Sequence, residues 1–408
     1  MTSLRNNINS LNSYLLISLF FLLPFSRAAG TILSLTILAG WLLSCDFKND
    51  FEKLKNNQVL LSIILFISLN VVGFLWTDDI NNGIHTLKRL WRLLMIPIFM
   101  LYVKKEHIYY YISSFILAMS ISELLSYGVW FEIIPPFLKA TVHEPIPFYT
   151  HLTYNPFLTI AIYLLSINLL FNKNISPIKR TLYSIFLVTM TINMFITGGR
   201  SGQVMFFFAI LILNFQYFQG KIIKASVISL TLIIGIFTLA YSTSHIFHTR
   251  VNNAVHAINH HDNKNISSTG LRMTFNINSF DVFLNHPFIG VGTGDFITEY
   301  KKINEKNSPT IRIPSDPHSM YLIEMVQFGI LGLLSLLFIF YTQIRYALSN
   351  QDKLLSKIGI TLPLLYFIIN FSGAYLQNSE TSLIFALFSS FLYKNYTEKT
   401  SPNLHKSS

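Results

Sequence analysis

The sequence predicts an all-α membrane protein, and three observations support this fold class. Hydrophobic residues make up 51% of the 408 residues and charged residues only 12%, whereas roughly 25% of the residues of a soluble domain are charged. Apolar runs close to the ~20 residues that cross a bilayer recur along the whole chain. Because no long soluble stretch divides them, we expect one polytopic membrane domain over residues 1–408.

The net charge of +11 does not indicate a nucleic-acid partner. The basic residues are dispersed among the loops, and no soluble basic domain is predicted that would hold a duplex. The single cysteine, Cys45, excludes an internal disulfide and offers no metal site of its own. The expected surroundings are therefore membrane lipids.

About twelve segments are predicted to be membrane-spanning helices. The first two resemble a signal peptide, because Arg5 precedes an apolar core and small residues follow it. A second apolar run begins at once, so we interpret the pair as two retained spans. The predicted spans are 13–25, 28–45, 58–76, 90–103, 107–130, 154–171, 181–197, 202–218, 225–242, 319–343, 358–377 and 381–393.

The distribution of basic residues predicts the orientation. With a cytoplasmic amino terminus, the cytoplasmic segments carry most of the lysine and arginine residues, and the short loops on the other side carry few. The segment 243–318, between the ninth and tenth spans, is long enough to escape this rule. We therefore expect both termini in the cytoplasm and this segment outside.

The long loop 243–318 is predicted to be helical. Helices are expected at 246–258 and 270–284, and the second ends at the Asn285-His286-Pro287 turn and the glycine cluster that follows. The cluster GVGTG lacks the spacing of a nucleotide-binding fingerprint, so we interpret it as a turn.

His318 stands where this loop meets the tenth span. Asp316 is expected to cap a helix whose first turn holds Pro317 and His318. The positive end of the helix dipole disfavours imidazolium, which favours a neutral ring that accepts a proton. The alternative is a polar residue that marks the water interface.

Two arginines are candidates for binding an anion. Arg200 follows two glycines in a short external turn, and a charge near membrane depth is usually paired or functional. Arg272 lies near the start of a helix that Thr269 is expected to cap, so the helix amides would add to an anion site. The alternatives are an interface anchor for Arg200 and a solvated side chain for Arg272.

Metal sites are weaker hypotheses. His256 and His260 have helical spacing, but the only carboxylate nearby is Asp262, so we expect no metal there. Asp78 and Asp79 would hold a divalent cation, but adjacent carboxylates on an extended segment point apart. Glu324, within the tenth span, is expected to face the bundle interior or a polar cavity.

The residues resemble the O-antigen ligase family, which belongs to a superfamily shared with O-antigen polymerases. The resemblance in topology covers nearly the whole chain. The resemblance in sequence rests on three short motifs. His318-Ser319 with Gly329 and Gly332 downstream is similar to the family's histidine motif; Arg200 within GRSG and Arg272 within GLR are similar to its two arginine segments.

The resemblance implies a metal-independent, inverting glycosyltransferase of the GT-C type without a cofactor, in the bacterial inner membrane. The donor would be O-antigen on undecaprenyl diphosphate, and the acceptor a sugar hydroxyl of lipid A-core. His318 would be the base, and Arg200 and Arg272 would bind the diphosphate. Apart from the resemblance, Lys88, Arg89 and Arg92 are expected to add positive potential near the same surface, with their individual roles left open. The runner-up is a polymerase of the same superfamily, and a lipid-linked glycan transporter is a third hypothesis.

Overall fold

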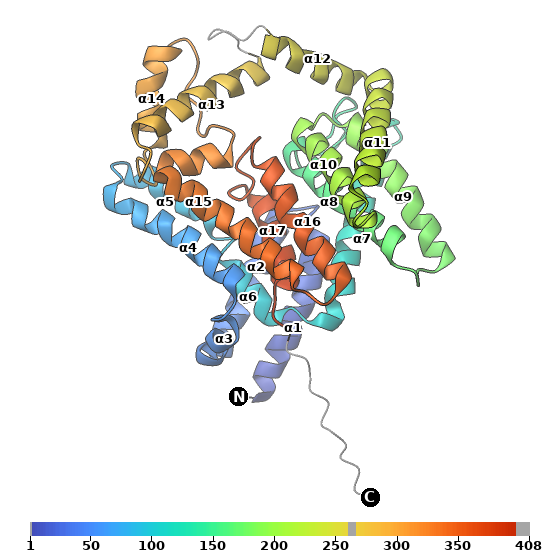
Figure 1. The fold of residues 1–408 in the computed structure, drawn as a ribbon. Coiled ribbons are helices and arrows are strands. Elements are labelled where there is room, and N and C mark those ends of the chain that lie inside the picture. Colours follow the sequence, from blue (N-terminus) through green and yellow to red (C-terminus); the bar gives the residue numbers. More distant parts are fainter. Residues whose placement is uncertain (1, 260–266, 397–408) are drawn as a thin grey trace, which may run out of the picture.

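The computed structural model describes residues 2–259 and 267–396, and all regular elements in these two ranges are helices (Figure 1). Ser26, Asn57 and Asp352 begin helices as side-chain caps, as small polar residues do. The α-helices are α1 Thr2–Leu22, α2 Arg27–Ser44, α3 Phe47–Leu54, α4 Gln58–Val72, α5 Ile80–Leu90, α6 Met95–Tyr102, α7 Ile108–Trp130, α8 His151–Phe171, α9 Pro177–Ile196, α10 Arg200–Tyr217, α11 Ile222–Thr243, α12 His245–Asn259, α13 Ser268–Asn285, α14 Phe296–Asn307, α15 Met320–Leu348, α16 Lys353–Ile369 and α17 Ser379–Leu392.

Each predicted span coincides with a helix, but the helices differ from the prediction in length. In the described residues, six are long and apolar enough to cross a membrane: Arg27–Ser44, Gln58–Trp76, Lys105–Trp130, His151–Phe171, Ile222–Thr243 and Met320–Leu348. The span predicted at 90–103 is wrong in extent, because α6 has only 8 residues and is about 12 Å long. Twelve spans remain a prediction.

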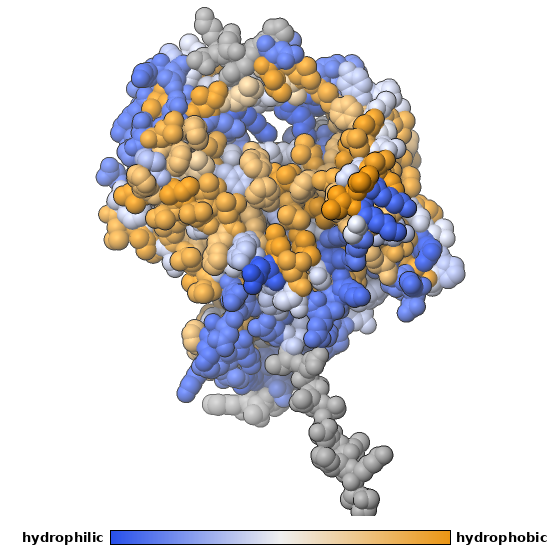
Figure 2. All heavy atoms as spheres, in the orientation of Figure 1, coloured by the Kyte–Doolittle hydropathy of each residue, from blue (hydrophilic) through white to orange (hydrophobic). Residues whose placement is uncertain are grey.

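The core of the bundle lies around α8, which packs against α7, α9, α10, α16 and α17. Its buried polar groups are paired across helices. The hydroxyl of Tyr163 donates to Gln216 Oε1 over 2.9 Å and accepts from Thr361 over 2.9 Å. Figure 2 shows a band of hydrophobic side chains across the middle of this face, with hydrophilic side chains toward both ends. This pattern is that of a membrane protein.

The segment between α11 and α15 forms one end of the molecule (Figure 1). The two helices predicted there are confirmed as α12 and α13, and α14 is a third that the sequence did not predict. Helices α13 and α14 share a small core around Phe275 and Tyr300. In Figure 2 the surface is hollowed below α12 and α13.

Helix α15 is broken at Gly329, whose φ of 62° and ψ of −148° are not helical. The carbonyls of Val326 and Gln327 accept hydrogen bonds from the amides of Val291 and Gly292, both over 2.9 Å. The predicted turn at the glycine cluster is therefore confirmed, and its amides satisfy the backbone of α15 at the break. This contact joins the loop to the start of α15, which follows His318.

Candidate active site

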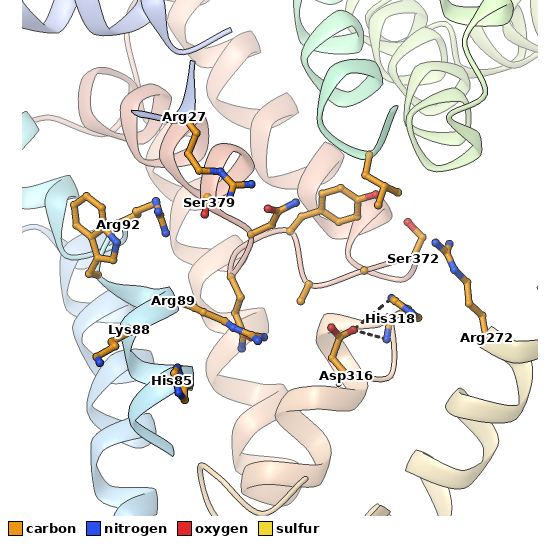
Figure 3. Close-up of a pocket in the computed structure, with 17 residues that line it drawn as sticks. Arg27, His85, Lys88, Arg89, Arg92, Arg272, Asp316, His318, Ser372 and Ser379 are labelled. Carbon is orange, nitrogen blue, oxygen red and sulfur yellow. Dashed lines mark hydrogen bonds and ion pairs between the residues drawn. The ribbon is translucent and has the colours of Figure 1, made fainter. Parts of the chain in front are cut away.

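A cavity of about 590 Å³ lies at the end of the bundle that α13 covers. Three walls form it. The first is α5 with the turn after it, the second is α13 with the segment that carries Asp316 and His318, and the third is the loop between α16 and α17 (Figure 3). Its lining is strongly basic, and Asp316 is its only acidic member among the described residues. The lining residues are Arg27, His85, Lys88, Arg89, Trp91, Arg92, Leu152, Arg272, Asp316, His318, Ser372, Gly373, Ala374, Tyr375, Gln377, Asn378 and Ser379.

His318 lies before α15, and not in its first turn as predicted. Ser319 is the N-cap, and its hydroxyl accepts from the amide of Leu322 over 3.5 Å. Asp316 does not cap the helix, because its Oδ1 instead accepts the backbone N–H of His318 over 2.8 Å. His318 has a φ of 55°, a left-handed conformation that costs about 1–2 kcal/mol for a residue with a side chain. Strain of this kind is found preferentially at functional sites.

The imidazole of His318 lies between Asp316 and α13. Its Nδ1 is 3.5 Å from Asp316 Oδ1, and its ring centroid is 6.0 Å from that of Phe275. The side chain remains 38% exposed, so the ring is accessible from the cavity. A carboxylate beside Nδ1 leaves Nε2 free for a substrate, which is the arrangement of an oriented general base.

Burial lowers the pKa of His318 from its ordinary value, and the positive charges of Arg272 and Arg312 lower it further, whereas the Asp316 carboxylate raises it. The direction agrees with the prediction, and burial is the largest cause. The ring is therefore neutral at pH 7, as a proton acceptor must be.

Arg272 shares this cavity with His318. It lies on the first turns of α13 and extends toward Ser372 on the loop opposite (Figure 3). Arg272 forms no ion pair with another residue in the described ranges, so its guanidinium is free to bind an anionic ligand. The cap of α13 is Ser267, whose hydroxyl accepts from the Gly270 amide over 3.1 Å, and not Thr269 as predicted.

Arg200 does not line the cavity, but it contacts the helix that carries Arg272. Its Nη1 donates to Thr269 Oγ1 over 2.6 Å, and its Nη2 donates to Ser268 Oγ over 2.9 Å. The close packing of Gly199 and Gly202 on Asn155 places Arg200 here. The structure therefore brings His318 and Arg272 together in one cavity. Arg200 lies outside this cavity, against the first turn of the helix that carries Arg272.

The sequence analysis missed two contributions to this site. Arg27, at the start of α2, lines the cavity and pairs with the buried carboxylate of Glu380 on α17. The loop between α16 and α17 forms a wall and is held to α15, because the carbonyl of Asn370 accepts the amide of Met320 over 2.9 Å. A weak signal existed for Arg27, a lone arginine between two apolar runs. The loop carried none.

The other candidates do not join the site. Asp79 caps α5, because its Oδ1 accepts the backbone amide of Asn82 and its Oδ2 accepts the side-chain amide of Asn82. The carboxylate of Asp295 accepts the backbone amides of Asp78 and Asp79. Glu324 is fully buried within α15, as predicted, but it does not line the cavity. Within the described residues no group of three metal-ligating side chains forms. His260, His261 and Asp262 lie outside the described residues.

The fold and the cavity define a class: a polytopic helical membrane protein with an oriented histidine and unpaired guanidinium groups around one cavity. Residues 185–337 match the family model described as O-antigen ligase, in agreement with the resemblance of the sequence. The matched segment includes Arg200, Arg272 and His318. The family implies a glycosyltransferase-like membrane enzyme. No curated protein matches the chain significantly.

Proposed function

We propose that the protein is an O-antigen ligase of the bacterial inner membrane. It transfers O-antigen glycan from undecaprenyl diphosphate to a sugar hydroxyl of lipid A-core, with inversion and without a metal ion. Both termini face the cytoplasm and the cavity faces the periplasm. The observation that carries the proposal is that His318, oriented by Asp316, opens into the same cavity as Arg272.

The reaction requires a base and a stabilised leaving group. His318 Nε2 accepts the proton of the acceptor hydroxyl as its oxygen forms a bond to the anomeric carbon of the donor sugar. The bond from that carbon to the diphosphate oxygen breaks, and undecaprenyl diphosphate leaves with the electron pair. Attack opposite to the leaving oxygen inverts the anomeric centre.

Arginines supply the charge that the departing diphosphate needs. The planar guanidinium of Arg272 matches phosphate oxygens in a bidentate manner, and Arg200 adds a second positive charge behind it. Asp316 stabilises the imidazolium that forms on His318. Fixed cations in a partly closed cavity stabilise developing negative charge without a metal ion.

The test is lipopolysaccharide profiling of a strain that lacks the gene, complemented with wild type, His318→Ala or Arg272→Ala. A ligase predicts that the null strain accumulates polymerised O-antigen on its lipid carrier and a bare core. Neither variant restores transfer at a normal protein level. A null strain with single O-units on the core would identify a polymerase instead, and lipid-linked O-antigen left on the cytoplasmic face would identify a transporter.

A further inference from the structure

The cavity holds more positive charge than one diphosphate neutralises. A diphosphate joined to a polyprenol and a sugar carries two negative charges. Arg272 lines the cavity, and Arg200, which contacts the first turn of α13 from outside the cavity, adds a second positive charge. Besides Arg272, and Arg27 with its partner Glu380, three cations line the cavity: Lys88, Arg89 and Arg92. None of the three forms an ion pair or a side-chain hydrogen bond with another residue that the structure describes, although Arg92 stacks 4.8 Å from the centroid of Trp91.

The other charges around the cavity do not neutralise these three. Glu380 pairs with Arg27 and its charge also attracts Arg92, but one carboxylate cannot neutralise both arginines. Asp316 is engaged by His318. A group of unpaired cations on one helix end repels itself, and a bound anion relieves this repulsion. The lining therefore indicates a second anionic ligand.

The two groups of cations lie on opposite sides of the base. Figure 3 shows Lys88, Arg89 and Arg92 on α5 and the turn after it, Arg272 across the cavity on α13, and Asp316 with His318 between them. Inverting transfer places the attacking hydroxyl on the side of the anomeric carbon away from the diphosphate. If the diphosphate lies at Arg272, the acceptor lies on the α5 side of the cavity.

We infer that Lys88, Arg89 and Arg92 form a subsite for a phosphate substituent carried by the acceptor sugar near its attacking hydroxyl. This inference rests on the proposed function. The subsite comes from outside the segment 185–337 that matches the family domain. In this proposal the matched segment carries the base and the donor site. The amino-terminal part of the chain, through Lys88, Arg89 and Arg92, selects the acceptor.

The experiment uses the purified full-length protein in nanodiscs of neutral phosphatidylcholine, so that lipid headgroups supply no net negative charge. Two acceptors are compared: phosphorylated lipid A-core and the same material after removal of its phosphates with hydrofluoric acid. Wild type is expected to show a KM for the phosphorylated acceptor that is lower by about tenfold or more, as for the loss of one charge-assisted contact. Arg89→Gln is expected to remove this preference and to leave the KM for the donor unchanged.

Control variants separate a local effect from a general one. Lys306→Gln removes a positive charge from the exposed surface of α14 and should leave both acceptor KM values unchanged. Arg272→Gln should raise the donor KM instead. Lys88→Gln repeats the test if Arg89→Gln does not give a monodisperse protein.

Three outcomes would overturn the inference: equal KM values for the two acceptors in wild type, a donor KM that rises in Arg89→Gln, or a preference that Arg89→Gln retains. Direct binding of the two acceptors, measured by thermophoresis without donor, keeps the inference separate from the reaction. If wild type transfers nothing but binds the phosphorylated acceptor more tightly, the proposed function fails and the subsite stands. The same comparison is repeated in nanodiscs of anionic lipid. A preference for the phosphorylated acceptor that appears only there would assign the cations to membrane headgroups and overturn the acceptor subsite.

Discussion

One oxygen of Asp316 contacts His318 twice: Oδ1 accepts the backbone N–H over 2.8 Å and lies 3.5 Å from Nδ1 of the ring. The first contact holds the left-handed backbone of His318, and the second orients its imidazole. The same carboxylate therefore sets the loop and the side chain.

Asp316→Asn is expected to change the pH profile of transfer. Wild-type activity should be full at pH 7 and fall as the pH drops through the lowered pKa of His318, because only the neutral ring accepts a proton. Asp316 raises that pKa, so its neutralisation should move the acid limb to lower pH. The plateau of kcat should fall roughly 10- to 100-fold, less than the 10²–10⁴ attributed to a general base itself.

This variant separates an electrostatic role from a purely structural one. An asparagine Oδ1 still accepts the backbone N–H of His318, so the loop should be retained. If Asp316 only holds the loop, the acid limb and the plateau of Asp316→Asn would both match wild type.

His318→Asn should abolish most of the transfer without disturbing the fold. Asparagine tolerates positive φ better than most residues, so it suits the φ of 55° at this position, but it has no proton-accepting nitrogen. We expect kcat to fall about 10²–10⁴-fold with an unchanged melting temperature and donor affinity. His318→Ala should lose the same activity and also some stability. Full activity in His318→Asn would show that this residue is not the base.

The sequence predicted the helical class better than it predicted the geometry of the candidate site. Apolar runs depend only on composition, so a helix stands at every predicted span. The position of His318 depends on which residue caps α15. Asp316 and Ser319 are both good capping residues. Because the backbone turns at His318, the helix begins after Ser319, and Ser319 is its cap.

Contacts between distant segments could not be predicted from local pattern. Arg200 and Thr269 are far apart in the chain, and their hydrogen bond depends on how α10 and α13 meet. Arg27 likewise enters the cavity only because α2 and α17 lie side by side. No periodicity or motif carries that information.

Gly290→Ala should destabilise the protein severely. Gly290 has a φ of 68°, and a Cβ there would lie 2.3 Å from the backbone of Gln327 and Phe328. The clash would separate the glycine turn from the break in α15 and disturb the segment that holds His318. We expect a loss of several kcal/mol, seen as low yield or a strongly lowered melting temperature in detergent.

Gly235→Ala is the matched control for this prediction. Gly235 lies in α11, and a Cβ there meets nothing within 4 Å. Because alanine favours a helix over glycine by about 1 kcal/mol, the melting temperature should stay or rise. Equal stability of the two variants would contradict the role given to the glycine turn.

Arg200 is expected to act on the donor partly through α13. Its two hydrogen bonds, to Ser268 and Thr269, hold the first turn of the helix that carries Arg272. The double variant Ser268→Ala/Thr269→Val keeps Arg200 but removes both acceptors. It should raise the donor KM several-fold, which corresponds to about 1 kcal/mol in total, with the acceptor KM unchanged.

A thermodynamic cycle between Arg200→Ala and Arg272→Ala tests this coupling. If Arg200 positions Arg272, the effects of the two changes on donor binding are not additive, and the double variant is little worse than Arg272→Ala alone. A second cycle combines Arg200→Ala with Ser268→Ala/Thr269→Val and serves as the internal control. The double variant at 268 and 269 should have no further effect on donor binding once Arg200 is alanine. Additive effects in both cycles would show that Arg200 and Arg272 act on the donor independently.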